Sequence, residues 1–428
     1  MIADTAITES SLTGTPMAAA MITEAAQKLH KPLTLFTPCP PASDSESWEK
    51  LSEDLKARLI KNGEQYLHYE YPSLTAVDFM EFTRTGNRSR YQDRLFARRT
   101  ALDTLVLAEC VEHRGRFLDD IINGLYLICE ENAWQLPAHN SYIRDTPQFP
   151  LPDVTRPVID LFAAETASIL AVAEYLLRSE LNEVSPFLSV MIGHELETRI
   201  FTPYLEEHFW WMGDGKSHMN NWTVWCTQNV LLSAFTRPLP SETQTRILCR
   251  AARSIDYFLD EYGEDGCCDE GAQYYRHAGL CLFGCLEILN GITDHAFSFA
   301  WKQEKIRNIA SYILNVHVDS IYYVNFADCS PVAGRCNARE YLFGKRTDNR
   351  ALMEFAASDY QNSEDPLTLD EHNLFYRLQT VFSHEEMMES DRNPVIAHKD
   401  LYYESVGLFI VRGSRLCLAV KGGDNDDS

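Results

Sequence analysis

The stretch that decides how this chain is interpreted is Asp265-Gly266-Cys267-Cys268-Asp269-Glu270-Gly271-Ala272-Gln273-Tyr274-Tyr275-Arg276-His277. It begins as an acidic loop with two glycines and continues into residues suited to a first helical turn. Tyrosine and histidine side chains can give and take protons, and an arginine can lower the pKa of a phenol or bind a carboxylate. The sequence predicts a loop-to-helix junction carrying proton-transfer groups, although aromatic pairs at helix starts more often serve packing.

Three segments, in the same order, resemble a known family. Asp265-Gly266, Glu270-Gly271 and Tyr274 resemble the D-G-x-x-x-E-G-x-x-Y stretch of the heparinase II/III-like polysaccharide lyases, which include oligoalginate lyases. Residues 221–225 (Asn-Trp-Thr-Val-Trp) resemble the N-H-x-x-W segment of that family, and residues 325–328 (Asn-Phe-Ala-Asp) resemble a later loop of the same domain. The resemblance covers residues 45 to 428.

The pattern of apolar residues predicts a mainly α fold. From Trp48 onward, apolar residues recur at three- and four-residue steps, which is typical of helices that pack as antiparallel hairpins. The expected helices span residues 45–66, 91–112, 117–132, 158–177, 186–206, 223–234, 241–262, 270–289 and 297–316. Periodicity alone leaves open a hairpin array or a closed toroid, and the resemblance implies an incomplete (α/α) toroid.

Beyond residue 345 the pattern changes to that of β-strands. Residues 401–412 and 416–420 form β-rich runs separated by Gly413-Ser414, a hairpin signal. They resemble the first strands of the family's antiparallel β-sandwich, which would continue beyond Ser428, so we expect an incomplete sandwich with an exposed edge that favours association. The expected domains are a loosely ordered lead-in (1–46), the toroid (47–345), and a linker with the start of the sandwich (346–428).

The amino-acid composition restricts which partners this protein can bind and in which cellular compartment it is expected. A formal net charge of −24 argues against nucleic-acid binding, so an anionic substrate would need a local cluster of Arg, His or amide donors. No signal-peptide pattern and no apolar run near the ~18 residues of a membrane span is present, and twelve cysteines without a C-x-x-C pair are typical of a cytoplasmic protein. We expect no cofactor in this chain; a structural metal in the rest of the sandwich and a homodimer are left open.

A zinc site formed by Cys267 and Cys268 with His277, Cys281 and Cys285 is the weaker interpretation, because adjacent cysteines rarely bind one tetrahedral ion. Buried thiols on an apolar helical face are favoured, and no metal ligands are expected.

The resemblance implies a carbon–oxygen lyase that cleaves uronic-acid-containing glycans by β-elimination. This reaction needs a group that neutralises the uronate, a base that removes the C5 proton, and an acid that protonates the leaving oxygen. By resemblance, Asn221 binds the carboxylate and Tyr274 is the general acid and, for some substrates, also the base. Tyr275 is a rival, because a one-residue shift would exchange the two. Trp222 stands where the family commonly has His, and His218 is a candidate replacement, weighed against an ordinary loop histidine.

The His that the family's second domain supplies would lie beyond Ser428, so an inactive chain is one of the expected outcomes. His139 is a candidate for sugar binding or helix capping, and Trp222 and Trp225 for stacking or packing. Arg276 and His277 are candidates for binding the substrate carboxylate, and Glu270 for substrate contact. Glu195 and Arg199 are expected to form an i,i+4 ion pair.

Two other classes of function remain open. A glycoside hydrolase would use paired carboxylates, for which Asp265, Asp269, Glu270 and Asp328 are available. The other class is binding without turnover, either of acidic sugars in the same cleft or of proteins on a helical array.

Overall fold

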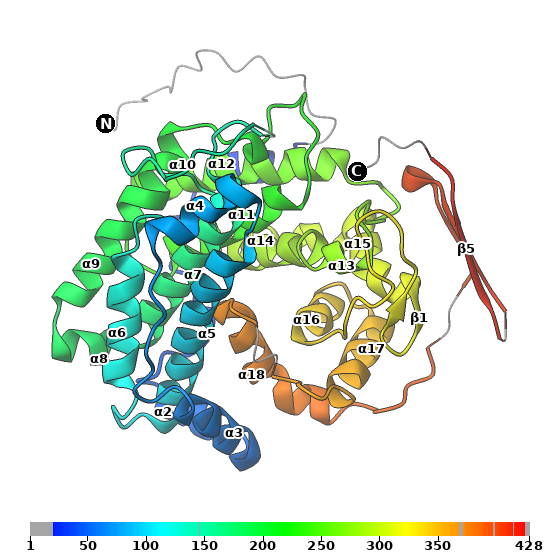
Figure 1. Ribbon diagram of the computed structural model, residues 1–428. Helices are drawn as coiled ribbons and strands as arrows, with labels where there is room; N and C mark the ends of the chain where they lie inside the picture. Colours follow the sequence, from blue (N-terminus) through cyan, green and yellow to red (C-terminus); the bar gives the residue numbers. More distant parts are fainter. Residues whose placement is uncertain (1–19, 145, 368–370, 397–398, 414, 424–428) are drawn as a thin grey trace.

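The computed structural model describes residues 20–144, 146–367, 371–396, 399–413 and 415–423. Within these residues the fold is mainly helical, with two small antiparallel sheets in the C-terminal part, as the sequence predicts (Figure 1). None of the described helices has the length and apolar character to cross a membrane.

The helices follow one another along most of the chain. The first part contains α1 (Met21–Gln27), α2 (Ser45–Glu49), α3 (Glu53–Glu64), α4 (Ala76–Thr85), α5 (Ser89–Glu112), α6 (Leu118–Cys129), α7 (Leu161–Leu176), α8 (Arg178–Val184), α9 (Phe187–Leu196) and α10 (Thr202–Glu206). The second part contains α11 (Asn221–Phe235), α12 (Ser241–Glu261), α13 (Ala272–Tyr275), α14 (Gly279–Ile292), α15 (Glu304–Val316), α16 (Ala338–Arg346), α17 (Arg350–Gln361) and α18 (Leu374–Met388). The strands are β1 (His317–Asp319), β2 (Tyr322–Tyr323), β3 (Leu401–Tyr403), β4 (Leu408–Arg412) and β5 (Cys417–Lys421).

Helix α11 lies at the centre of the packing. It contacts α7, α12 and α14, and nearly all of its residues are buried. A helix that is buried on every side cannot show the one-sided apolar stripe of a surface helix. Its N-terminal residue, Asn221, is therefore held in place by the core.

The helical part continues beyond residue 345, where a linker was expected. Helices α17 and α18 follow α16, and α18 packs against α7 as well as against α16 and α17. In Figure 1, α18 lies between the α5 and α7 side of the molecule and the α16 and α17 side. The last helix, α18, thus packs against α7 from the first half of the chain.

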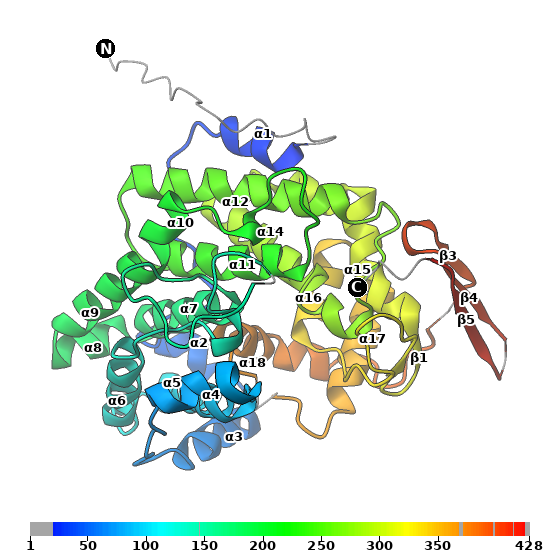
Figure 2. The ribbon, with the colours of Figure 1, turned by 45° about the horizontal axis from the view of Figure 1, so that its top comes forward.

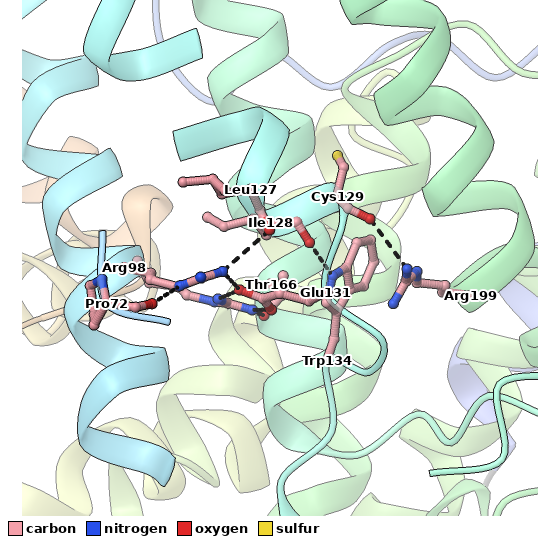
Figure 3. A network of polar contacts seen from close by, with 10 residues as sticks. Pro72, Arg98, Leu127, Ile128, Cys129, Glu131, Trp134, Thr166 and Arg199 are labelled. Carbon is pink, nitrogen blue, oxygen red and sulfur yellow. Dashed lines mark hydrogen bonds and ion pairs between the residues drawn. The ribbon is translucent and has the colours of Figure 1, made fainter. Parts of the chain in front are cut away.

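A buried ion network joins α5, α7 and the residues that follow α6 (Figure 3). Glu131 accepts from Arg98 at 2.9 Å and from Arg99 at 2.5 Å. Arg99 also donates to Thr166 of α7 at 3.1 Å. Because one carboxylate is shared by two buried guanidinium groups, the arrangement depends on that carboxylate.

The described part of the expected N-terminal lead-in is packed against the core. Asp256 of α12 accepts from the backbone N–H groups of Ile22 at 3.0 Å and Thr23 at 2.7 Å, which holds the start of α1. Figure 2 shows α1 lying over α12. Residues 1–19 of the expected lead-in lie outside the described residues.

The C-terminal sheet has the order β3-β4-β5, and all of its pairs are antiparallel. One face buries Tyr403, Leu408 and Ile410, and Tyr403 packs on Tyr312 of α15 with ring centroids 5.8 Å apart. The opposite face exposes apolar side chains at Tyr402, Phe409, Leu418 and Val420. Ser414 of the predicted turn lies outside the described residues, while a bond of 2.8 Å from Gly413 N–H to the Leu416 carbonyl closes the β4–β5 hairpin.

Candidate functional site

The loop before α13 has a shape that requires its two motif glycines. Gly266 has φ +77°, and an added Cβ would lie 2.3 Å from the backbone carbon of Asn308. Gly271 has φ +85°, and its Cβ would lie 2.5 Å from the Cβ of Cys329. Only glycine combines this backbone conformation with so close an approach. The shape of the loop therefore explains why glycine follows Asp265 and Glu270 in the motif.

Asp265 connects this loop to the C-terminal sheet. Its carboxylate accepts from the Ser405 hydroxyl at 2.7 Å, from the Ser405 N–H at 2.9 Å and from the Cys267 N–H at 3.1 Å. Both oxygens are engaged, so Asp265 holds the loop in place against Ser405.

Asn221 and Glu270 meet although they are 49 residues apart in sequence. The Asn221 amide donates to Glu270 Oε2 at 2.7 Å, and Asn220 fixes the start of α11 by accepting from the Trp222 N–H at 3.0 Å. Burial raises the pKa of Glu270, and Asp269 and Asp328 add to this effect, while the Asn221 bond opposes it. The two motif segments thus meet in a hydrogen bond between Asn221 and Glu270. The Glu270 carboxyl takes up a proton more readily than an ordinary glutamate.

Tyr274 and Tyr275 have very different environments. Tyr274 is half-buried, and its hydroxyl makes no hydrogen bond to any residue that the structure describes. Burial raises its pKa, as do Asp328 and Glu270, while Arg88 lowers it. The Tyr275 side chain is fully buried and donates to the Ala310 carbonyl at 3.3 Å. Of the two rivals, only Tyr274 has a hydroxyl free to meet a substrate.

Aromatic side chains from α5, α7 and α11, together with His277 between α13 and α14, lie next to these groups. We call them the aromatic platform: Phe96, Phe162, Trp222, Trp225 and His277. Phe96, Phe162, Trp225 and His277 contact one another in that order, and Trp222 is joined to them through the His139 ring. The His277 ring stacks on Trp225 with centroids 4.0 Å apart and planes 10° apart, and Tyr274 lies at its edge with centroids 6.3 Å apart. Most of the platform is half-buried, as expected for rings that both pack and offer a face to a ligand.

His139 is oriented by a buried carboxylate that sequence analysis missed. Its Nδ1 lies 2.7 Å from Asp160 Oδ2, and Asp160 has no exposed surface. Asp160 also caps α7 by accepting from the Ala163 N–H at 2.7 Å. The His139 ring contacts Trp222 edge-on, with centroids 4.7 Å apart. An imidazole therefore lies beside Trp222, with Nδ1 held by Asp160 and Nε2 outside that contact.

A pocket of about 260 Å³ adjoins His139 and Trp222. Trp210 contacts Trp222 with centroids 5.0 Å apart, and the guanidinium of Arg144 lies 4.7 Å from the Trp210 ring centroid. This face is aromatic and carries positive charge at its rim.

His218 is held by acids. Its Nδ1 lies 2.5 Å from Glu261, and its Nε2 lies 3.7 Å from Asp269. The pKa of His218 is raised, chiefly by Asp269 and also by Glu261, although Glu261 makes the shorter contact. A histidine that prefers its charged form is a poor replacement for a neutral imidazole.

Arg276 and His277 follow the tyrosines but point to different surroundings. Burial, with help from Arg339 and Arg276, lowers the pKa of His277 to about 3, so the ring stays neutral and is a weak base. Arg276 donates to the Arg335 carbonyl and lies 3.7 Å from Glu340. It lines a pocket of about 540 Å³ on the side of α16 and α18.

The remaining predicted residues are explained by packing and pairing. Glu195 and Arg199 form the expected i,i+4 ion pair at 2.6 Å. Across the described residues, no three or more His, Cys, Asp or Glu side chains are grouped to hold a metal ion. Cys281, from the zinc alternative, is a buried thiol that contacts the Tyr376 hydroxyl at 3.4 Å.

Neither a family model nor a curated protein sequence matches this chain. Support for a function therefore comes from the motif segments and from the geometry that they adopt.

Proposed function

We propose that this chain belongs to a lyase that cleaves uronic-acid-containing oligosaccharides by β-elimination, on an incomplete (α/α) toroid of the heparinase II/III-like type. The observation that carries the proposal is the Tyr274 hydroxyl, which is half-buried and has no hydrogen bond to a described residue, beside the Asn221–Glu270 contact. The glycine-shaped loop that presents Tyr274 matches the family motif at each of its fixed positions.

The raised pKa of Tyr274 suits the role of general acid. The phenol stays protonated at neutral pH and can give its proton to the glycosidic oxygen as the C4–O bond breaks. One N–H of the Asn221 amide is bound to Glu270, and the other is left to donate to the uronate as it gains enolate character.

His139 is the proposed acceptor of the C5 proton. Asp160 holds Nδ1 in its protonated form, which leaves Nε2 as the basic nitrogen. The electron pair of the C5–H bond forms the C4–C5 double bond, and the pair of the C4–O bond leaves with the oxygen that Tyr274 protonates. Stacking of a pyranose on the aromatic platform would place the reacting ring beside these groups.

The test is ultraviolet absorbance by the conjugated double bond of an unsaturated uronate. The chain is mixed with alginate, heparan, chondroitin and pectic oligosaccharides, and reducing ends are counted in parallel. We expect Tyr274→Phe to lower kcat by about 10²- to 10⁴-fold, the usual contribution of a general acid. Tyr322→Phe, at an exposed tyrosine of β2, is the matched control and should leave the rate unchanged.

Two further variants separate the roles. Tyr275→Phe tests the one-residue shift and should cost stability more than rate, because its hydroxyl is bound inside the core. His139→Gln should lower kcat as well, because the glutamine amide is polar but cannot act as a base at neutral pH. Absorbance that is unaffected by Tyr274→Phe would remove the assignment of the acid.

A glycoside hydrolase is the second candidate, because one observation favours it. Glu270 has a raised pKa and lies within the electrostatic reach of the exposed Asp328, and a proton-holding carboxyl near a carboxylate is the acid–base arrangement of glycosidases. New reducing ends without ultraviolet absorbance, abolished by Glu270→Gln, would establish hydrolysis. Binding without any cleavage would support the sugar-binding alternative.

A further inference from the structure

Arg339 of α16 is a buried cation with no carboxylate at ion-pair distance among the described residues, although Glu340 and Glu371 act on its charge from farther away. It is 6% exposed, and its Nη2 donates to the Cys281 thiol at 3.6 Å. Its guanidinium lies 3.6 Å from the centroid of the Tyr376 ring, which stabilises the charge without using the N–H groups. A guanidinium carries five donors, and a thiol is a weak acceptor. Its Nε and Nη1 make no hydrogen bond to a described residue and are not fully buried, so they are accessible from the pocket that Arg339 lines.

Arg339 lines the pocket of about 540 Å³ introduced above. This volume falls within the roughly 300–1,000 Å³ typical of small-molecule sites. Two other arginines reach the same pocket, but each already faces an acid: Arg335 contacts Asp359 at 3.0 Å, and Arg276 lies 3.7 Å from Glu340. Arg339, which Glu340 and Glu371 reach only beyond ion-pair distance, is therefore the cation best able to take an anionic group of a ligand.

The other lining residues restrict the ligand to a singly charged, hydroxylated acid. Four carboxylates line the pocket together with the polar side chains of Asn337 and Ser363: Glu340, Glu364, Asp365 and Glu371. These carboxylates would repel a dianion such as phosphate, whereas they accept hydrogen bonds from hydroxyl groups. A carboxylate on a guanidinium, with hydroxyls on carboxylates and amides, is the pattern that fits a sugar monoacid.

We propose that this pocket binds the carboxylate of a uronate residue through Arg339, while Glu371 and Glu364 accept its hydroxyl groups. The identity of the ligand as a sugar acid rests on the proposed function; the assignment of Arg339 as an anion-binding group does not. Arg339 and Arg276 of the pocket act electrostatically on His277, which stacks on Trp225, so the pocket lies near the aromatic platform without sharing its residues.

The experiment is titration calorimetry of the whole chain with sodium glucuronate and mannuronate, compared with glucose, inorganic phosphate and glycine. We expect the uronates to bind, and glucose to bind at least about tenfold more weakly because it lacks the charge. Arg339→Gln should weaken uronate binding by about 10- to 100-fold. Arg346→Gln is the matched control on the same helix, because Arg346 is exposed and paired with Glu287 at 2.6 Å.

Ile321→Trp guards against a folding defect of the buried variant. Ile321 lines the pocket and is half-buried, so an indole there would occupy the space and leave Arg339 in place. Circular dichroism establishes whether each variant is folded. Loss of binding in Ile321→Trp and in folded Arg339→Gln supports the proposal; if Arg339→Gln unfolds, Ile321→Trp decides.

The outcomes distinguish this proposal from the proposed function. Arg339-dependent uronate binding without elimination on any glycan would keep the pocket and remove the lyase. Elimination with an unchanged KM in Arg339→Gln, and no binding of free uronate, would remove the pocket and keep the lyase. Tighter binding of phosphate or glycine than of uronate would overturn the ligand class, and uronate binding unchanged in both variants would overturn the site.

Discussion

Glu165 of α7 is a carboxyl buried in the core behind the aromatic platform. It is 4% exposed and accepts from the Asn373 amide at 3.0 Å. Burial raises its pKa to about 7, while His372 and the Asn373 bond act in the opposite direction. A glutamate in an unfolded chain titrates near about 4.3, so the folded and unfolded states bind different numbers of protons between these two values.

This difference predicts a pH dependence of stability with a definite sign. As the pH rises from about 4.3 to about 7, the unfolded chain loses this proton first, so the free energy of unfolding decreases and then levels off. Glu165→Gln keeps an acceptor for Asn373 and removes the charge. We expect it to raise the free energy of unfolding by about 1–3 kcal/mol at about pH 8, with little change at about pH 4.

Urea unfolding at the two pH values measures the effect of Glu165→Gln. Glu304→Gln, at an exposed position of α15, is the control. An equal pH dependence in the wild type and Glu165→Gln would show that Glu165 does not carry a raised pKa.

Ala327 adopts a left-handed backbone, with φ +49°, between Phe326 and Asp328. An L-residue pays about 1–2 kcal/mol for this conformation, whereas glycine adopts it freely but loses more entropy on folding. Ala327→Gly should therefore raise the free energy of unfolding by about 0.5–1 kcal/mol, measured by thermal unfolding. Because Asp328 lies within the electrostatic reach of Tyr274, a looser loop should also change the pH profile of cleavage. A lower stability of Ala327→Gly would contradict the assignment of strain.

Among the elements, the junction of α5, α6 and α7 depends on Glu131. Glu131→Gln would leave Arg98 and Arg99 buried without a carboxylate. We expect a loss of about 3–5 kcal/mol in the free energy of unfolding, measured in urea. Glu64→Gln breaks an exposed pair with Arg116 and should cost less than about 1 kcal/mol. Similar losses in the two variants would mean that the network is not coupled to the packing of the helices.

Most helices could be predicted from the sequence because their apolar residues follow a helical period. Helices α5 and α12 lie where the pattern places them, whereas the expected helix 297–316 is divided into a 3-10 turn (Ser298–Lys302) and α15. The expected helix 270–289 is interrupted between α13 and α14, and periodicity could not foresee this because the apolar positions stay in phase across residues 276–278. Helices α17 and α18 were missed although apolar residues recur there at helical spacing, because the whole segment after residue 345 was assigned to a linker and the start of a sandwich.

The candidate site was predictable only where the motif is local. Gly266 and Gly271 could be anticipated, because backbone shape is a property of a short segment. Asp160 carried a visible signal as the residue before an apolar helical run, but its contact with His139 depends on how a loop of 20 intervening residues folds. Nothing in the sequence separates the buried Arg339 from the exposed Arg346 seven residues later, because burial is decided by tertiary packing.

At the scale of the whole molecule, the helical part and the β3–β5 sheet are joined by a few contacts. Asp265 binds Ser405, Tyr403 packs on Tyr312, and Arg412 donates to the Asn315 carbonyl at 2.7 Å. These contacts lie on the face of the sheet that buries Tyr403 and at the end of β4. The opposite face carries Tyr402, Phe409, Leu418 and Val420, which are between 47% and 61% exposed. A contiguous apolar face next to an open strand edge promotes association.

We therefore expect concentration-dependent self-association, which Leu418→Lys should weaken by placing a charge in the middle of the apolar face. Light scattering over a range of protein concentrations measures it. A lysine also lowers the magnitude of the net charge of −24, which by itself favours association, so a charge-matched control is needed. Val395→Lys supplies it, because Val395 is 97% exposed and lies outside the sheet. If the two variants associate equally, the sheet face is not the surface involved; if only Leu418→Lys becomes monomeric, the apolar face holds the chains together against their mutual repulsion.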